Sequence, residues 1–272
     1  MKFGLFIGFT CNYVSGGSAG PLPDGADGAM YDPSVLSSLF QDAAGTIPVT
    51  SDGDPVGRMN DLSGGSYDQI QGTDAARPVY KTAGGLHWLQ GDGAAHWMLC
   101  TTLALSNEWT HVGGWLANAS QDCAFGLADS GNAALRSAAG WNWPDDGGTF
   151  VELNDGDRST AHLASVVQRS DDVIGGWLIG VDEITLNPFE TGGNSSLALF
   201  FQETDRFRRG LNGNFYGGVF VKGALTDGQR QTAEQWAAGK AGVTLSTPAP
   251  SGTTFDLSSI TFDNISLTFD EA

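Results

Sequence analysis

Two tryptophans separated by one residue stand before an acidic turn, and their side chains are well suited to bind a sugar. The segment reads Trp141-Asn142-Trp143-Pro144-Asp145-Asp146. An aromatic ring offers a flat apolar surface for a sugar ring, while amide and carboxylate oxygens accept hydrogen bonds from sugar hydroxyls. We therefore name Trp141, Asn142, Trp143, Asp145 and Asp146 as a candidate carbohydrate-binding site. Because tryptophan is highly buried on average, the alternative is that one or both rings fill the core.

Hydrolysis of a bound sugar chain would also require catalytic carboxylates. A retaining glucanase needs two carboxylates on one strand face, in an E-x-D-x-E or E-x-D-x-x-E pattern. The nearest approach is Glu152 with Asp155 and Asp157, but Asn154-Asp155-Gly156 is typical of a turn. The one G-x-S-x-G match, residues 16–20 (GGSAG), lies in a Gly-, Ser- and Pro-rich linker rather than between a strand and a helix, so it offers no nucleophile elbow. We expect no catalytic residue and no enzymatic activity.

Metal-ligating residues show no spacing that predicts a site. The four histidines lack H-x-H or H-x₃-H spacing and stand in or beside apolar runs, which favours buried, hydrogen-bonded imidazoles: His87, His96, His111 and His162. Cys11, Cys100 and Cys123 are odd in number and contain no CxxC pair, so we expect reduced thiols. We predict no metal-binding residue and no cofactor. The many carboxylates leave Ca²⁺ binding open, without a defined site.

The charge of the chain limits its partners. The formal net charge is −18, with 13 Lys and Arg against 31 Asp and Glu. Nucleic acids and anionic membrane surfaces need a basic face, so we expect neither as a partner. No apolar run reaches the length of a membrane span. Arg206, Arg208 and Arg209 form the one local basic cluster, which could hold an acidic glycan or an acidic neighbour.

Short apolar runs separated by turn residues must position these side chains. Clusters of Gly, Asp and Asn separate runs rich in Val, Ile, Phe and Trp, and Gly alone contributes 39 residues. This pattern predicts an all-β sandwich or barrel. The clearest runs are 111–116, 150–153, 163–168, 177–181, 197–202 and 215–221.

Two helices are predicted beside the strands. Asp32-Pro33 favours the start of a short helix whose apolar stripe would be Val35, Leu36, Leu39 and Phe40. A second helix would begin with the capping box Thr226-x-x-Gln229 and end before Gly242. Its face of Ala233, Trp236, Ala237 and Ala241 would lay Trp236 against the sandwich.

Both termini carry apolar residues without an obvious place in one sandwich. Phe3, Leu5, Ile7 and Phe9 alternate in the manner of a half-buried strand. The tail repeats Thr-Phe-Asp three times at a spacing of seven, with its aromatic rings at Phe255, Phe262 and Phe269. We predict that these segments carry assembly by adding strands to a neighbouring chain. The alternative is that both segments add edge strands to their own sandwich.

Several short motifs follow one another in a characteristic order along residues 31–245. They are Tyr31-Asp32-Pro33-Ser34, Val56-Gly57-Arg58, Asp61-Leu62-Ser63-Gly64, Ala76-Arg77-Pro78, residues 85–93 (GLHWLQGDG), Leu211-Asn212-Gly213, Tyr216-Gly217 and residues 236–243 (WAAGKAGV). In this order they resemble the concanavalin A-like and laminin G-like lectin and glucanase modules of tailed-bacteriophage structural proteins. The resemblance implies a two-sheet jelly-roll sandwich.

These observations together give an expected organisation and function. We expect an N-terminal assembly strand and linker at 1–30, a concanavalin A-like sandwich at 31–247 and a β-type assembly tail at 248–272. The resemblance implies a non-enzymatic phage virion protein, a head decoration, head fibre or tail fibre component, made in the bacterial cytoplasm. It would join other virion proteins, or a homo-oligomer such as a trimer, and could bind host surface polysaccharide. The alternatives are a dedicated carbohydrate-binding adhesin and a secreted glycan hydrolase.

Overall fold

A computed structural model gives the fold of most of the chain between residues 20 and 245. It describes residues 20–103, 108–118, 122–127, 134–137, 141–144, 150–153, 161–168, 174–178, 182–186, 197–200 and 209–245. The strands within 122–153 and 174–186 are described by their backbone alone. The predicted assembly segments, with Phe3, Leu5, Ile7, Phe9, Phe255, Phe262 and Phe269, lie outside these ranges.

The described strands form two sheets. The first is antiparallel and runs in the order β15 (Asp182–Leu186), β14 (Ile174–Leu178), β13 (His162–Gln168), β8 (Trp109–Ala117), β18 (Asn212–Val221), β6 (Leu86–Asp92) and β5 (Val79–Ala83). Strand β1 (Gly28–Tyr31) adds to β18. The runs predicted at 111–116, 163–168 and 215–221 lie in β8, β13 and β18, which confirms them as strands.

The second sheet faces the first. Its order is β12 (Phe150–Leu153), β11 (Trp141–Pro144), β10 (Ala134–Ser137), β9 (Asp122–Leu127), β16 (Leu197–Leu199), β7 (Met98–Cys100), β4 (Gln69–Ile70), β3 (Arg58–Met59) and β2 (Leu39–Phe40). These strands pair antiparallel, whereas β17 (Arg209–Gly210) pairs parallel with β9. A short 3₁₀ turn, η2 (Asp74–Ala76), follows β4.

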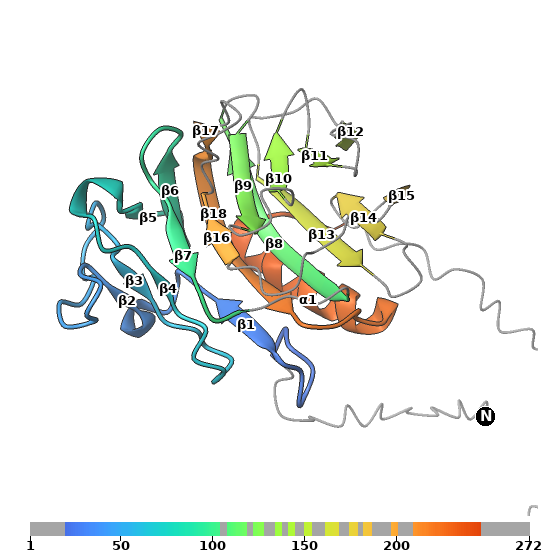
Figure 1. Ribbon diagram of the computed structural model, residues 1–272, viewed down its shortest axis with the longest axis horizontal. Coiled ribbons are helices and arrows are strands. Elements are labelled where there is room, and N and C mark those ends of the chain that lie inside the picture. Colours follow the sequence, from blue (N-terminus) through green and yellow to red (C-terminus); the bar gives the residue numbers. More distant parts are fainter. Residues whose placement is uncertain are drawn as a thin grey trace, which may run out of the picture.

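The second sheet, the first sheet and one helix form three layers, and buried apolar residues fill the two spaces between them (Figure 1). The main core lies between the sheets, where Trp115, Phe215 and Phe220 of the first sheet meet Met98 and Leu199 of the second. A second cluster lies between the first sheet and the helix α1 (Asp227–Ala241). The predicted all-β two-sheet sandwich with a C-terminal helix is confirmed.

The local sequence sets both ends of α1 as predicted. The Thr226 side chain accepts a hydrogen bond from the Gln229 backbone N–H, while the Gln229 side chain accepts one from the Thr226 backbone N–H. Gly242 ends the helix in the left-handed conformation, with φ of 68°. Trp236 is partly buried against the cluster that joins α1 to the first sheet.

The predicted N-terminal helix is wrong. Asp32 does accept a hydrogen bond from the Ser34 backbone N–H at 2.9 Å, but only one 3₁₀ turn follows, η1 (Leu36–Ser38). Leu39 and Phe40 then form β2 and pair with β3. Burial of Leu39 in the core between the sheets outweighs the weak helical preference of this serine-containing segment.

Candidate functional site

A groove opens on the outward face of the second sheet, where β4 lies beside β7. Its volume is about 320 Å³, and its lining residues are Ser66, Asp68, Ile70, Trp97, Leu99, Thr101 and Thr102. We call it the β4–β7 groove. The first sheet has α1 on its own outer face, so the groove lies on the side of the sandwich away from that helix (Figure 1).

Strand alternation explains why this groove has an apolar floor. Met98 and Cys100 are fully buried in the core, so Leu99 between them faces outward. Ile70 is 39% exposed and pairs with Leu99 across β4 and β7. Trp97 and Thr101 continue the alternation on either side of Leu99. The groove therefore combines an aromatic ring and two aliphatic side chains with three hydroxyl groups and one carboxylate.

Asp68 supplies the carboxylate, and its own contacts hold it in place. Its Oδ1 accepts a hydrogen bond from the Asp61 backbone N–H at 2.8 Å, and its Oδ2 pairs with Arg58 Nη2 at 2.5 Å. A carboxylate can accept about four hydrogen bonds, so these two contacts leave acceptor capacity for a ligand hydroxyl. Asp68 is thus a fixed acceptor at the polar side of the groove.

The loop from Asp61 to Asp68 places Ser66 and Asp68 at the groove. Asp61 Oδ1 accepts hydrogen bonds from the backbone N–H groups of Met30 and Ser63, and Oδ2 accepts one from the Ser63 hydroxyl at 2.6 Å. The Tyr31 hydroxyl donates to the Tyr67 carbonyl oxygen from within the core. This loop is therefore tied to β1 as well as to its own sheet.

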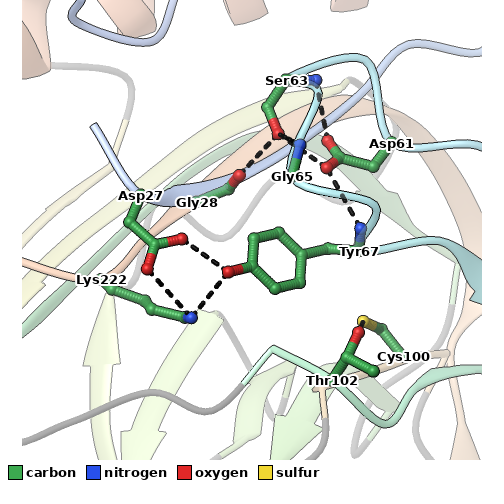
Figure 2. A network of polar contacts seen from close by, with 9 residues as sticks. All are labelled: Asp27, Gly28, Asp61, Ser63, Gly65, Tyr67, Cys100, Thr102 and Lys222. Atoms are coloured by element: carbon green, nitrogen blue, oxygen red, sulfur yellow. Dashed lines mark hydrogen bonds and ion pairs between the residues drawn. The ribbon is translucent and has the colours of Figure 1, made fainter. Parts of the chain in front are cut away.

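A polar cluster of Asp27, Tyr67 and Lys222 fastens the same loop (Figure 2). The Tyr67 hydroxyl donates to Asp27 Oδ1 at 2.6 Å and accepts from Lys222 Nζ at 2.7 Å. The hydrogen bond from Tyr67, together with Lys222, lowers the pKa of Asp27 despite the opposing effect of burial. Burial acts to lower the pKa of Lys222, but its bonds to Tyr67 and Asp27 raise it overall. The charged Asp27, just before β1, and the charged Lys222, just after β18, are thus joined to each other and to Tyr67 of the loop.

The tryptophan pair predicted from the sequence lies on the same sheet but at a different place. Trp141, Asn142 and Trp143 form β11 with Pro144, and Trp143 pairs with Val151 of β12. Four strand spacings separate β11 from β7, or about 19 Å. Only the backbone of β11 is described, and Asp145 and Asp146 lie outside the described residues. The candidate site at these five residues therefore stays a prediction, separate from the groove.

Sequence reasoning did not identify the groove residues. Trp97 lies just before β7, and the alternation Trp97-x-Leu99-x-Thr101 was the available signal for one outward face. The partner half, Ser66, Asp68 and Ile70, comes from a separate pair of chain segments. Their pairing with β7 depends on long-range register, which no local pattern encodes.

His87, His111 and Cys100 make contacts within the sandwich that indicate structural roles. His87 bonds to the Tyr80 hydroxyl at 2.6 Å, His111 is fully buried and bonds to the Val219 carbonyl oxygen and the Trp115 Nε1–H, and Cys100 is a buried free thiol. Among the described residues, no three His, Cys, Asp or Glu side chains are grouped so that they could hold a metal ion. No helix in the described part of the chain is long and apolar enough to span a membrane.

Comparison with known proteins identifies structures of similar fold. Neither a protein-family model nor a curated protein matches the sequence. Two structures of Trypanosoma rangeli sialidase, with sialic acid and with 2,3-difluorosialic acid, are each 9% identical and cover 72% and 82% of this chain, with TM-scores of 0.50 and 0.51. This chain spans 32% and 35% of those sialidase chains. Domain 4 of a GH43 extracellular arabinanase from Geobacillus stearothermophilus, in complex with arabinotriose, is 14% identical, with 64% of this chain and 92% of that domain covered and a TM-score of 0.48.

The likeness to the sialidase shows the fold and corrects one prediction. The expectation that the chain is not an enzyme is wrong as an exclusion, because about a third of a glycoside hydrolase chain shares its fold. The error lies in the motif that was sought. Paired carboxylates on one strand belong to retaining glucanases, whereas sialidases use a tyrosine nucleophile. The missing E-x-D-x-E pattern therefore does not exclude glycan hydrolysis.

Proposed function

We propose that this chain is a carbohydrate-binding β-sandwich domain of the concanavalin A-like, jelly-roll type, and that it binds glycans in the β4–β7 groove. The observation that carries the proposal is the composition of the groove. Trp97 is set beside Ile70 and Leu99, and hydroxyls and the Asp68 carboxylate surround them. A sugar has an apolar ring face and a rim of hydroxyls, and it matches such a surface in both respects.

Fixed side chains favour binding, because less conformational entropy is lost when the ligand arrives. The Gln71 side-chain amide donates to the Trp97 carbonyl oxygen at 3.0 Å, and the Trp97 N–H donates to the Ala76 carbonyl oxygen at 3.0 Å. Asp68 is held by Arg58 and by the Asp61 backbone. The backbone of Trp97 and the side chain of Asp68 are therefore held in place before a glycan binds.

Replacing Trp97 by alanine should weaken glycan binding by about 1–3 kcal/mol, or about 5- to 150-fold in Kd, taking base–aromatic stacking as a guide. The measurement is titration calorimetry with a glycan chosen from an array. Trp97→Phe keeps a ring and should retain most of the affinity.

The matched control for this test is Ile47→Ala. Ile47 is an apolar residue 52% exposed outside the groove lining, so its removal should leave binding unchanged. Thermal unfolding of each variant separates a binding defect from a folding defect. Wild-type affinity in a folded Trp97→Ala variant would contradict the assignment of the groove, and binding lost in Trp141→Ala instead would favour the tryptophan pair.

We also propose that the domain is displayed on a phage particle, where glycan binding would serve host recognition. The support is the order of motifs in residues 31–245 and the apolar termini, which would join other virion proteins or further copies of this chain. We expect the protein to copurify with phage particles through a density gradient, at a fixed copy number. Particles that lack the protein, in a lysate that contains it, would contradict this setting.

A further inference from the structure

We infer that the β4–β7 groove selects uncharged glycans over acidic ones, and that the pairing of Arg58 with Asp68 sets this preference. The inference rests on the proposed function and adds the class of sugar that the groove accepts. Its basis is the charge that a ligand would meet there. Asp68 is the one charged residue among the described residues that line the groove.

Arg58 is the nearby cation that could have held an acidic sugar, but it is already engaged. Its Nη2 pairs with Asp68 Oδ2 at 2.5 Å, and its Nε donates to Asn60 Oδ1 at 2.8 Å. A guanidinium binds an anion best through a two-pronged contact from its planar fork, and these contacts occupy part of that fork. The groove therefore presents the carboxylate of the pair to a ligand.

An uncharged sugar finds complementary groups at this surface. Its hydroxyls can donate to Asp68 and accept from the hydroxyls of Ser66, Thr101 and Thr102. A sialic or uronic acid would place its carboxylate against Asp68, and like charges at close range oppose binding. The net charge of −18 adds a longer-range repulsion of acidic polysaccharides, which salt screens in part.

The experiment is a glycan array that presents each oligosaccharide with and without a terminal sialic acid or uronic acid, at about 0.15 M salt. The wild-type chain should bind the uncharged member of a matched pair about tenfold more tightly. Asp68→Asn removes the repelling charge and releases Arg58, while its amide oxygen can still accept from the Asp61 N–H. The preference should fall to about twofold or reverse.

A second variant keeps the test valid if Asp68→Asn does not fold. Thr101 is exposed at the groove, so Thr101→Lys adds a cation at little risk to the core. It should raise affinity for the acidic members relative to the uncharged ones, because the added cation attracts only the acid, while loss of the Thr101 hydroxyl affects both members of a pair alike. Tighter wild-type binding of acidic members, or an unchanged preference in both variants, would overturn this inference while glycan binding itself stands. Binding to neither member of any pair would instead overturn the proposed function.

Discussion

Replacing Glu234 by glutamine is expected to lower the free energy of unfolding by about 3–5 kcal/mol, because it removes the buried counter-charge of a buried arginine and leaves only the exposed Asp227, 4.0 Å away. Glu234 and Arg230 lie one turn apart on α1, with 2% and 6% of their surfaces exposed, and they form an ion pair where the helix packs on the first sheet. The Ser165 hydroxyl of β13 donates to Glu234 Oε1 at 2.6 Å. One carboxylate thus serves both a cation and a hydroxyl in the interior.

The matched control makes the same acid-to-amide change at the surface of the same helix. Asp227 is 72% exposed at its side chain and lies 4.0 Å from Arg230 Nε, so Asp227→Asn should cost less than about 1 kcal/mol through the loss of a weak, solvent-screened ion pair and of the interaction with the helix dipole. Urea unfolding followed by tryptophan fluorescence measures both variants. Equal, small losses for the two would show that the Arg230–Glu234 pair contributes little to holding α1 on the sheet.

The helix that carries this pair was predictable because its signals are local. The Thr226–Gln229 capping box and Gly242 act within a few residues, and each end of α1 follows from them. Residues 36–40 show the opposite case. Their apolar spacing fits a helix, but pairing of Leu39 with Met59 draws them into the second sheet. Where a distant strand competes with a weak local preference, the distant strand decides.

The candidate site was harder to predict than the fold for the same reason. The two tryptophans of β11 form a pattern visible in the sequence because one residue separates them, whereas the groove brings Trp97 beside Asp68 and Ile70 through the pairing of β4 with β7. A single tryptophan before a short strand carries no functional signal until its neighbours are known. The exclusion of enzymatic activity failed for a different reason, because the absence of one carboxylate motif does not exclude the other known routes to glycan hydrolysis.

Lowering the pH from about 6.5 to about 3 should destabilise the protein progressively through His111. Its imidazole is fully buried, and burial lowers its pKa to about 3, although a hydrogen bond to the Val219 carbonyl oxygen opposes the shift. The Trp115 Nε1–H donates to His111 Nε2 at 3.1 Å, which assigns the ring proton to Nδ1. Phe220 stacks on the ring with a centroid distance of 4.2 Å. The neutral form therefore has a partner at each nitrogen and a dry apolar setting.

The direction of the pH effect follows from where the proton binds. Between about pH 6.5 and pH 3 the unfolded chain protonates this histidine and the folded chain does not, so acid favours unfolding. Each pH unit in this window should cost about 1.4 kcal/mol, to a total of roughly 4–5 kcal/mol. Above about pH 6.5 both states are neutral and the contribution is constant.

A variant that cannot titrate at this position separates His111 from the carboxylates that also protonate in acid. His111→Gln should be less stable than wild type at pH 7, since it disturbs the packing with Trp115 and Phe220. Its stability should nevertheless fall less steeply with acid, so the difference between the two proteins should shrink from pH 6.5 toward pH 4. Urea unfolding at half-unit pH steps gives both curves. If the curves run parallel, protonation of His111 does not govern the acid sensitivity of the fold.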